Sequence, residues 1–188
     1  MPPELVELRL VTQHFLSYNA PRTGHADPAH YHLSCRVDGA PVTGELDTED
    51  LFSQLGGRFE RLGGREGQLL TASSAVQVLA ALAAHSDVLV HAPAPGGLPG
   101  GYPVRLRGGA RVDLGPRLTL GEAVRINEEC QRADGIESIA ADGTVTFTGP
   151  EMAVMKRLLG YECRTMPLAD TAHRAEELGR KYRQLTES

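Results

Sequence analysis

The sequence predicts an α+β fold, built mainly of antiparallel hairpins packed with about four helices. Two segments carry strong hairpin signals. Apolar and polar residues alternate over His30–Val37, which is followed by Asp38-Gly39, and a second alternating segment over 136–148 turns at another Asp-Gly pair. Asp-Gly favours the two-residue turn that joins antiparallel strands. Helical segments do not alternate regularly with single strands, so antiparallel sheet is favoured over parallel sheet.

Length and composition predict one globular domain over residues 1–188. Hydrophobic residues make up 41% of the chain and charged residues 23%, which is ordinary for a globular protein. Trp is absent and aromatic residues are only 5%, so we expect a core of Leu, Val and Ala. A glycine-rich connector at 63–67 indicates an alternative division into two subdomains, 1–62 and 68–188.

Charge and cysteine content exclude several classes of protein. The net charge is −5, and no run of Lys and Arg is interleaved with aromatic residues, which argues against a nucleic-acid partner. Three cysteines are an odd number, which fits a reducing compartment better than a disulfide framework. The start of the chain, MPPELVELRL, lacks the apolar stretch of a signal peptide. Since no apolar run is long enough to span a bilayer, we expect a cytoplasmic protein with no membrane partner.

The first part of the chain predicts two or three strands. Residues 4–16 alternate loosely and predict a strand, with a short helix as the alternative, and Asn19–Pro28 predicts a polar loop. The strand His30–Val37 is expected to return over Ala40–Asp47. The segment 48–62 then predicts a helix that begins with Thr48 as its N-cap.

Four further helices have clear boundaries in the sequence. An alanine-rich helix is expected from Thr71 or Ser73 to about residue 84. Thr119 and Glu122 form a capping box for a helix that ends at an Asp-Gly pair and buries Ala123, Ile126 and Cys130. The next helix is capped by Thr148 and ends at Gly160, and a strongly charged helix closes the chain over about 170–185.

An unusual segment lies in the middle of the chain. The apolar strand 87–91 enters ten residues of mostly Pro, Gly and Ala, and a second strand follows over Tyr102–Leu106. A three-residue loop over Gly108–Ala110 then leads to a third strand. This register places Arg105 opposite Asp113, a favourable cross-strand pair.

The Gly/Pro-rich loop is the best candidate for a ligand site. Successive N–H groups of a glycine-rich turn can bind an anion, and the arginines that follow can clamp a carboxylate or phosphate. The pattern is neither a dinucleotide fingerprint nor a P-loop, because the glycines lead into a strand. The alternative is a purely structural crossing between strands. We expect the substrate-binding residues to be Gly97, Gly100, Gly101, Arg105, Arg107 and Asn127.

Two side chains beside the loop could perform catalysis. His91 could act as a general acid or base near neutral pH, and Tyr102 could donate a hydrogen bond. The alternative for His91 is a polar residue with ordinary hydrogen bonds. Nucleophilic catalysis has little support, because Cys35 and Cys130 lie on apolar faces and no Gly-x-Ser-x-Gly elbow is present.

The first hairpin predicts a cluster of metal ligands on its polar face. Pairing outward from the turn places His32 opposite Glu45 and His30 opposite Asp47. Imidazole and carboxylate together suit Zn, Fe or Mn. The alternative is a solvated polar face, and a shift of one residue in the register would destroy the cluster.

The favoured function is a small-molecule metabolic enzyme, or its substrate-binding subunit, acting on a small anionic substrate held by the loop and the arginines. His91, or a divalent metal, would supply the polar chemistry. The alternative is a non-catalytic interaction protein, a homodimer or partner subunit, that uses the charged last helix and the edges of the hairpins.

Overall fold

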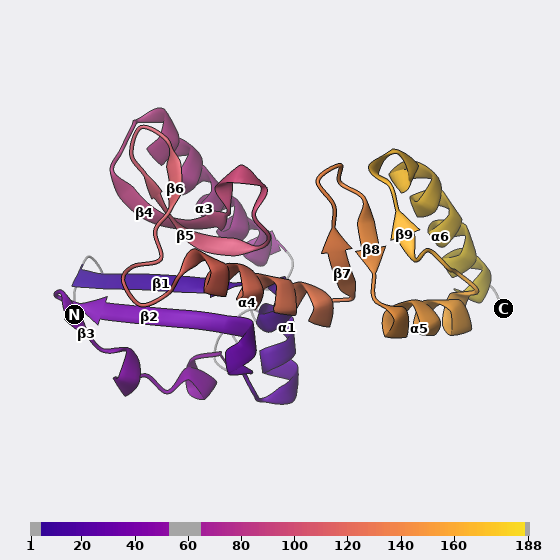
Figure 1. Cartoon of the computed structure of the whole chain (residues 1–188), viewed down its shortest axis with the longest axis horizontal. Coiled ribbons are helices and arrows are strands. Elements are labelled where there is room, and N and C mark those ends of the chain that lie inside the picture. Colours follow the sequence, from indigo (N-terminus) through magenta and orange to yellow (C-terminus); the bar gives the residue numbers. More distant parts are fainter. Residues whose placement is uncertain (1–4, 53–64, 187–188) are drawn as a thin grey trace. The chain divides into compact units, whose positions relative to one another are not determined.

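The computed structural model describes residues 5–52 and 65–186, and its contacts divide the chain into two compact units, 1–130 and 131–188. The first unit holds β1 (Val6–Thr12), α1 (His14–Thr23), β2 (Tyr31–Val37), β3 (Ala40–Pro41), α3 (Arg65–Ala83), β4 (Val88–Pro93), β5 (Gly101–Leu106), β6 (Ala110–Val112) and most of α4 (Leu120–Ala133) (Figure 1). The second holds β7 (Ile136–Ile139), β8 (Val145–Phe147), α5 (Gly149–Leu159), β9 (Thr165–Met166) and α6 (Thr171–Thr186). The predicted boundary at 63–67 falls partly outside the described residues and stays a prediction.

The α+β fold with antiparallel sheets is confirmed. Strands of the first unit follow the order β3-β2-β1-β5-β4, with β6 paired to β5, and those of the second follow β7-β8-β9. Every strand pair in the described part of the chain is antiparallel. No helix among the described residues is long and apolar enough to cross a membrane.

The first hairpin has the predicted turn but a much shorter return strand. Asp38 and Gly39 both have positive φ, 49° and 76°, as a type I′ turn requires. The prediction of a strand over 40–47 is wrong, because β3 ends at Pro41, which has no N–H for the ladder. Beyond Pro41, the side chain of Thr43 replaces a strand carbonyl as acceptor, since its hydroxyl accepts the N–H of Cys35 at 2.9 Å.

The main partner of β2 is β1, which pairs with it over its whole length, from Val6–Val37 to Thr12–Tyr31. This pairing buries Leu33 and Cys35, which the sequence placed on the apolar face of the strand. Val6, Leu8 and Leu10 lie on one face of β1. Glu7, Arg9 and Val11 alternate with them and lie on the opposite face.

The register predicted between β5 and β6 is wrong by two residues. Arg105 stands opposite Arg111 rather than Asp113, and the turn is Arg107-Gly108-Gly109, closed by the N–H of Arg107 on the carbonyl of Gly109 at 3.0 Å. Because side chains alternate with a period of two, a shift of two residues keeps every side chain on its predicted face. Asp113 still lies near Arg105, with 3.7 Å between its Oδ2 and the Nε.

Three helix boundaries in the first unit differ from prediction. Helix α1 occupies part of the segment expected to be a loop, where it buries Leu16 and Ala20 and ends at Gly24 in the left-handed conformation. Residues 48–52 are helical, but the N-cap is Asp47, whose Oδ1 accepts the N–H of Asp50 at 3.0 Å. Helix α3 begins at Arg65 rather than at Thr71 or Ser73, so the polar residues 65–68 also belong to the helix.

The boundaries of the last three helices follow the sequence. The capping box of α4 is formed, with the N–H of Thr119 donating to Glu122 Oε2 at 2.8 Å. Thr148 is the N-cap of α5, and Gly160 ends that helix with a φ of 61°. Capping depends on atoms within four residues of each other, so local sequence is sufficient to predict it.

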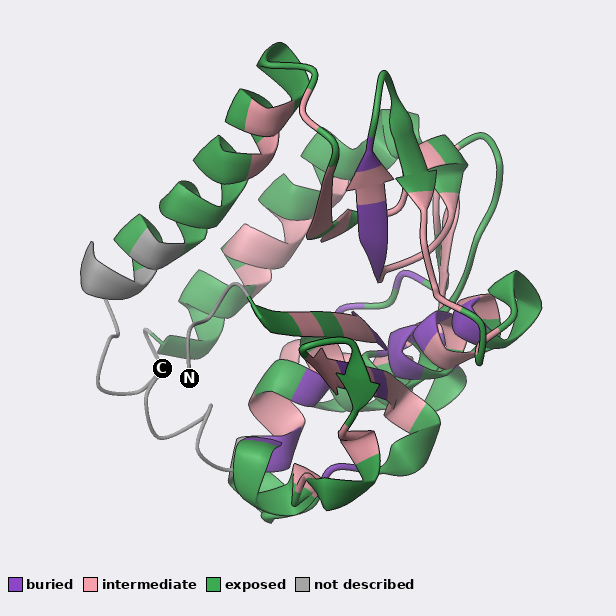
Figure 2. Ribbon diagram, turned by 90° about the vertical axis from the view of Figure 1, so that its left-hand side faces the viewer, coloured by how far each residue is buried: buried purple, intermediate pink, exposed green. Residues whose placement is uncertain are grey.

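The core of the first unit has two parts. One gathers Val11, Tyr102, Val104, Leu106 and Ala123, and the other gathers residues of α1 with Phe52. Buried residues therefore concentrate on α1, β5 and α4, whereas α3 is mostly exposed (Figure 2). The buried residues Tyr161 and Cys163 belong to the second unit.

Candidate functional site

The predicted metal cluster on the first hairpin does not have its expected geometry. Because β3 ends early, Glu45 lies in a 3₁₀ turn and Asp47 caps the next helix. His32 stands opposite Val11 of β1 and faces α4, and burial lowers its pKa. His30 lies in the turn before β2. Among residues 5–52 and 65–186, no three His, Cys, Asp or Glu side chains gather as metal ligands would. The strand register that would have brought the four ligands together is therefore not formed. Metal binding itself stays a prediction.

The Gly/Pro-rich segment is a loop over residues 94–100 that joins β4 to β5. Gly97 has a φ of 76°, and a Cβ there would meet no atom within 4 Å. Gly100 has a φ of 80°, and a Cβ there would lie 2.2 Å from Oδ1 of Asn127. Gly101 belongs to β5 and pairs with Thr12 of β1. Gly100 and Gly101 therefore allow close packing, and Gly97 borders open space.

Tyr102 and Asn127 are brought together in the core rather than in a cavity. Both are fully buried, with 0% exposure, and the amide nitrogen of Asn127 donates to the carbonyl of Gly101 at 3.3 Å. Burial raises the pKa of Tyr102, and neither its hydroxyl nor Oδ1 of Asn127 has a hydrogen-bond partner among the described residues. Gln13 donates to the backbone carbonyl of Asn127 at 2.6 Å. This buried group joins β1, β5 and α4.

His91 links two strands. Its Nε2 accepts the N–H of Leu10 in β1 at 3.0 Å. The residue of β5 opposite His91 is Pro103, which has no N–H, and β1 pairs with β5 only at Gly101 among the described residues. The imidazole thus serves as an acceptor where the ladder between β1 and β5 has opened. Burial, followed by the charge of Arg9, lowers the pKa of His91 and favours its neutral, accepting form.

Arg105 and Arg107 lie at a charged surface formed by β5, β6 and the end of α3. Asp87 holds both, with N–O distances of 3.4 Å to Arg105 and 3.7 Å to Arg107. These residues line a hollow of about 510 Å³, which we call the β5–β6 hollow. Its full lining is Asp87, Arg105, Arg107, Gly109, Ala110, Arg111 and Asp113.

A second, more apolar hollow of about 630 Å³ adjoins the Gly/Pro-rich loop, and we call it the loop hollow. Its lining is Pro95, Gly96, Leu98, Ala110, Arg111, Val112, Leu114 and Leu120. Ala110 and Arg111 line both hollows, so the arginine-rich surface and the loop meet along β6. The sequence indicated the loop and two of the arginines, but it carried no signal that Arg111 would stand between them.

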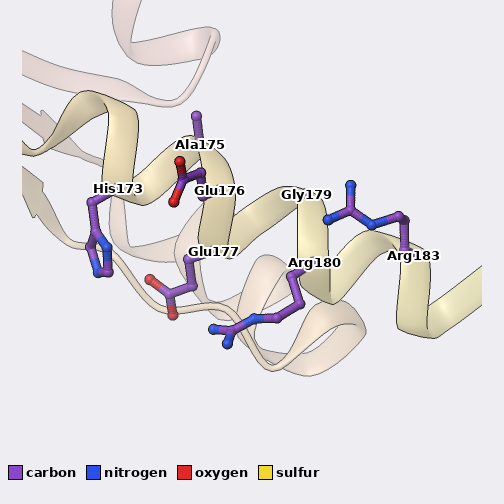
Figure 3. Close-up of a pocket in the computed structure, with 7 residues that line it drawn as sticks. All are labelled: His173, Ala175, Glu176, Glu177, Gly179, Arg180 and Arg183. Atoms are coloured by element: carbon purple, nitrogen blue, oxygen red, sulfur yellow. The ribbon is translucent and has the colours of Figure 1, made fainter.

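A third hollow lies on α6 of the second unit, and all of its lining residues come from this one helix (Figure 3). They include two glutamates, two arginines and His173. Arg174, on the same helix, pairs with Glu177 at 2.9 Å. Because two glutamates and two arginines line it together, this hollow favours no ligand of one sign. It fits the predicted charged outer face of the last helix.

All three cysteines are reduced and buried. The thiol of Cys130 donates to the carbonyl of His30 at 3.1 Å, and burial raises its pKa. A thiol that resists ionisation is a poor nucleophile, as the apolar environment predicted. In comparisons with protein-family models, curated proteins and solved structures, none matches this chain.

Proposed function

We propose that the chain binds a small amphipathic anion, as the substrate-binding subunit of a metabolic enzyme or as the enzyme itself. The observation that carries the proposal is the position of Arg111, which lines both the β5–β6 hollow and the loop hollow. A guanidinium at this junction suits a ligand with a carboxylate at one end and a hydrocarbon body at the other. The loop hollow, with Leu98, Val112 and Leu114, would receive the hydrocarbon body.

The charges of the β5–β6 hollow support an anionic ligand. Three arginines face two aspartates there, so this surface has an excess of positive charge in a chain whose net charge is −5. Asp87 positions Arg105 and Arg107. Arg111 is exposed and makes no ion pair within the described residues, so its guanidinium is available to a ligand.

The geometry supports binding more strongly than catalysis. His91 already accepts a backbone N–H, and Tyr102 is fully buried. Neither lines the β5–β6 hollow or the loop hollow. A substrate-binding subunit is therefore the preferred form of the proposal, and a partner would supply the reacting groups.

Calorimetric titration with octanoate and with butyrate tests this function. Octanoate should bind at least about tenfold more tightly than butyrate, because each additional buried CH₂ contributes about 0.8 kcal/mol. Arg111→Gln should weaken octanoate binding about tenfold or more, since it removes a charge-assisted contact. Arg22→Gln is the matched control, because Arg22 is exposed at the end of α1. Equal affinity for the two acids, or no effect of Arg111→Gln, would contradict the proposal.

A second candidate function is self-association through α3, and the exposure of its apolar stripe favours it. Leu69, Val76 and Leu79 are 65%, 61% and 64% exposed, and no charged residue lies between 69 and 84. Interface cores are depleted of charge, and a two-fold dimer uses the same patch on both copies. Sedimentation equilibrium should then show a dimer that Val76→Glu dissociates and that Gln77→Glu leaves intact. A monomer at all concentrations would exclude this function.

A further inference from the structure

A separate hollow of the first unit is lined by three guanidinium groups and by no carboxylate. We call it the β1–β2 hollow, and its volume is about 280 Å³. Its lining is Arg9, Ser34, Arg36, Pro41, Thr43, Leu114, Pro116 and Arg117. We propose that this hollow binds a phosphoryl group, for which inorganic phosphate is the simplest ligand. The proposal is independent of the proposed function, which uses the other arginines.

Arg9 forms a fixed, positively charged wall of the hollow. Its side chain is only 13% exposed, and its Nε donates to the backbone carbonyl of Asp113 at 3.1 Å. Its other nitrogens pair with the carboxylates of Glu7 and Asp113. Neither acid lines the hollow, so they hold Arg9 in position without competing for the ligand's place. Gly115, with a φ of 73°, lets the following turn pass close to this side chain.

The donors that remain available approach from different segments. Ser34 stands opposite Arg9 in the β1–β2 register. Arg36 donates its Nε and Nη2 to the carbonyl of Gly39, which fixes the guanidinium and leaves Nη1. Within the described part of the chain, Ser34 and Arg117 have no hydrogen bond or ion pair through their side chains. A hydroxyl and two guanidinium groups, contributed by β2 and by the segment after β6, suit a tetrahedral oxyanion, which accepts hydrogen bonds in several directions.

The size of the hollow restricts the ligand class. Sites for drug-sized molecules begin at about 300 Å³, so this hollow suits a phosphoryl group with a small substituent rather than a nucleotide cofactor. A phosphate group carries about −1.5 to −2 charges at pH 7, and its oxygens are strong acceptors. Arg36 and Arg117 make no ion pair among the described residues, so their guanidiniums favour phosphate over a neutral ligand.

Calorimetric titration of the full chain with inorganic phosphate, at constant ionic strength, tests the site. We expect one saturable site, and Arg117→Gln should weaken it about tenfold or more. Arg117→Lys keeps the charge but not the planar guanidinium, so its affinity for phosphate should lie between those of the wild type and Arg117→Gln. Arg117 is exposed, so these variants should fold, and circular dichroism checks this. Arg22→Gln is the control, because Arg22 is exposed at the end of α1, and it should bind phosphate as the wild type does.

Two results would overturn the inference. One is the absence of saturable phosphate binding by the correctly folded wild-type chain. The other is phosphate binding that Arg117→Gln leaves unchanged. If only Arg111→Gln abolished phosphate binding, the anion would be assigned to the β5–β6 hollow instead. In the converse case, failure of octanoate to bind while phosphate binding depends on Arg117 would refute the proposed function and support this site.

Discussion

Gly100 is the residue at which substitution should be most costly relative to its size. It has a φ of 80°, which disfavours any residue with a Cβ, and a Cβ there would lie 2.2 Å from Asn127 Oδ1 and 2.7 Å from Gln13 Cγ. Gly97, in the same loop, has a similar φ of 76° but no atom within 4 Å of the Cβ position. The two glycines therefore separate backbone strain from steric overlap.

The expected cost of Gly100→Ala has three parts. The left-handed backbone costs about 1–2 kcal/mol for an alanine. Displacing the packed side chains of Asn127 and Gln13 costs about 1–3 kcal/mol, as other overpacked cores do. Moving Asn127 also breaks its 3.3 Å hydrogen bond to the carbonyl of Gly101, at about 1 kcal/mol. The free energy of unfolding should therefore fall by about 4 kcal/mol, against about 1–2 kcal/mol for Gly97→Ala.

Urea unfolding followed by circular dichroism measures both variants under the same conditions. The double variant Gly100→Ala/Asn127→Ala should cost less than the sum of its single changes, because removing the amide relieves the closest overlap. If Gly100→Ala and Gly97→Ala lower the free energy of unfolding equally, the packing of the loop on α4 is not as described.

Two further predictions concern side chains that replace ladder hydrogen bonds. His91→Ala should lower the free energy of unfolding by about 0.5–1.5 kcal/mol, because it removes the acceptor of the N–H of Leu10. The pKa of His91 is lowered in the folded chain, so the contribution of His91 to stability is complete above the unfolded pKa of about 6.5 and is lost as the pH falls below it. His91→Ala should therefore lose less stability than the wild type between neutral and mildly acidic pH. An unchanged pH dependence would refute this role. Thr43→Val should cost about 1–3 kcal/mol in urea unfolding because Cys35 loses the acceptor of its N–H, whereas Thr43→Ser should stay near wild type.

Local sequence was sufficient wherever the deciding atoms lie within a few residues. The type I′ turn follows from Asp38-Gly39, because both positions need positive φ. The start of α4 follows from Thr119 and Glu122, which satisfy each other's hydrogen bonds. Alternation along β2 correctly placed Leu33 and Cys35 in the core. The α+β class could be predicted from such signals, since hairpins and capped helices are local units.

Local rules failed where a side chain competed with the ladder or a helix had weak signals. The return strand stopped at Pro41 because Thr43 satisfied the next backbone group through its hydroxyl. That early end separated Glu45 from His32 and removed the expected ligand pairing. Helix α1 is stabilised by burial of Leu16 and Ala20 against the sheet. Its polar sequence does not predict this packing.

The candidate sites were decided by tertiary structure. Arg9 and Asp113 are 104 positions apart, and Gln13 and Asn127 are 114 apart, yet each pair is in contact. Alternation along a strand indicates which side chains share a face, but it does not indicate which distant segment will cover that face. The sequence alone therefore determined the turns, the caps and the fold class, whereas the order of the strands, and with it the gathering of arginines, came from long-range packing of the core.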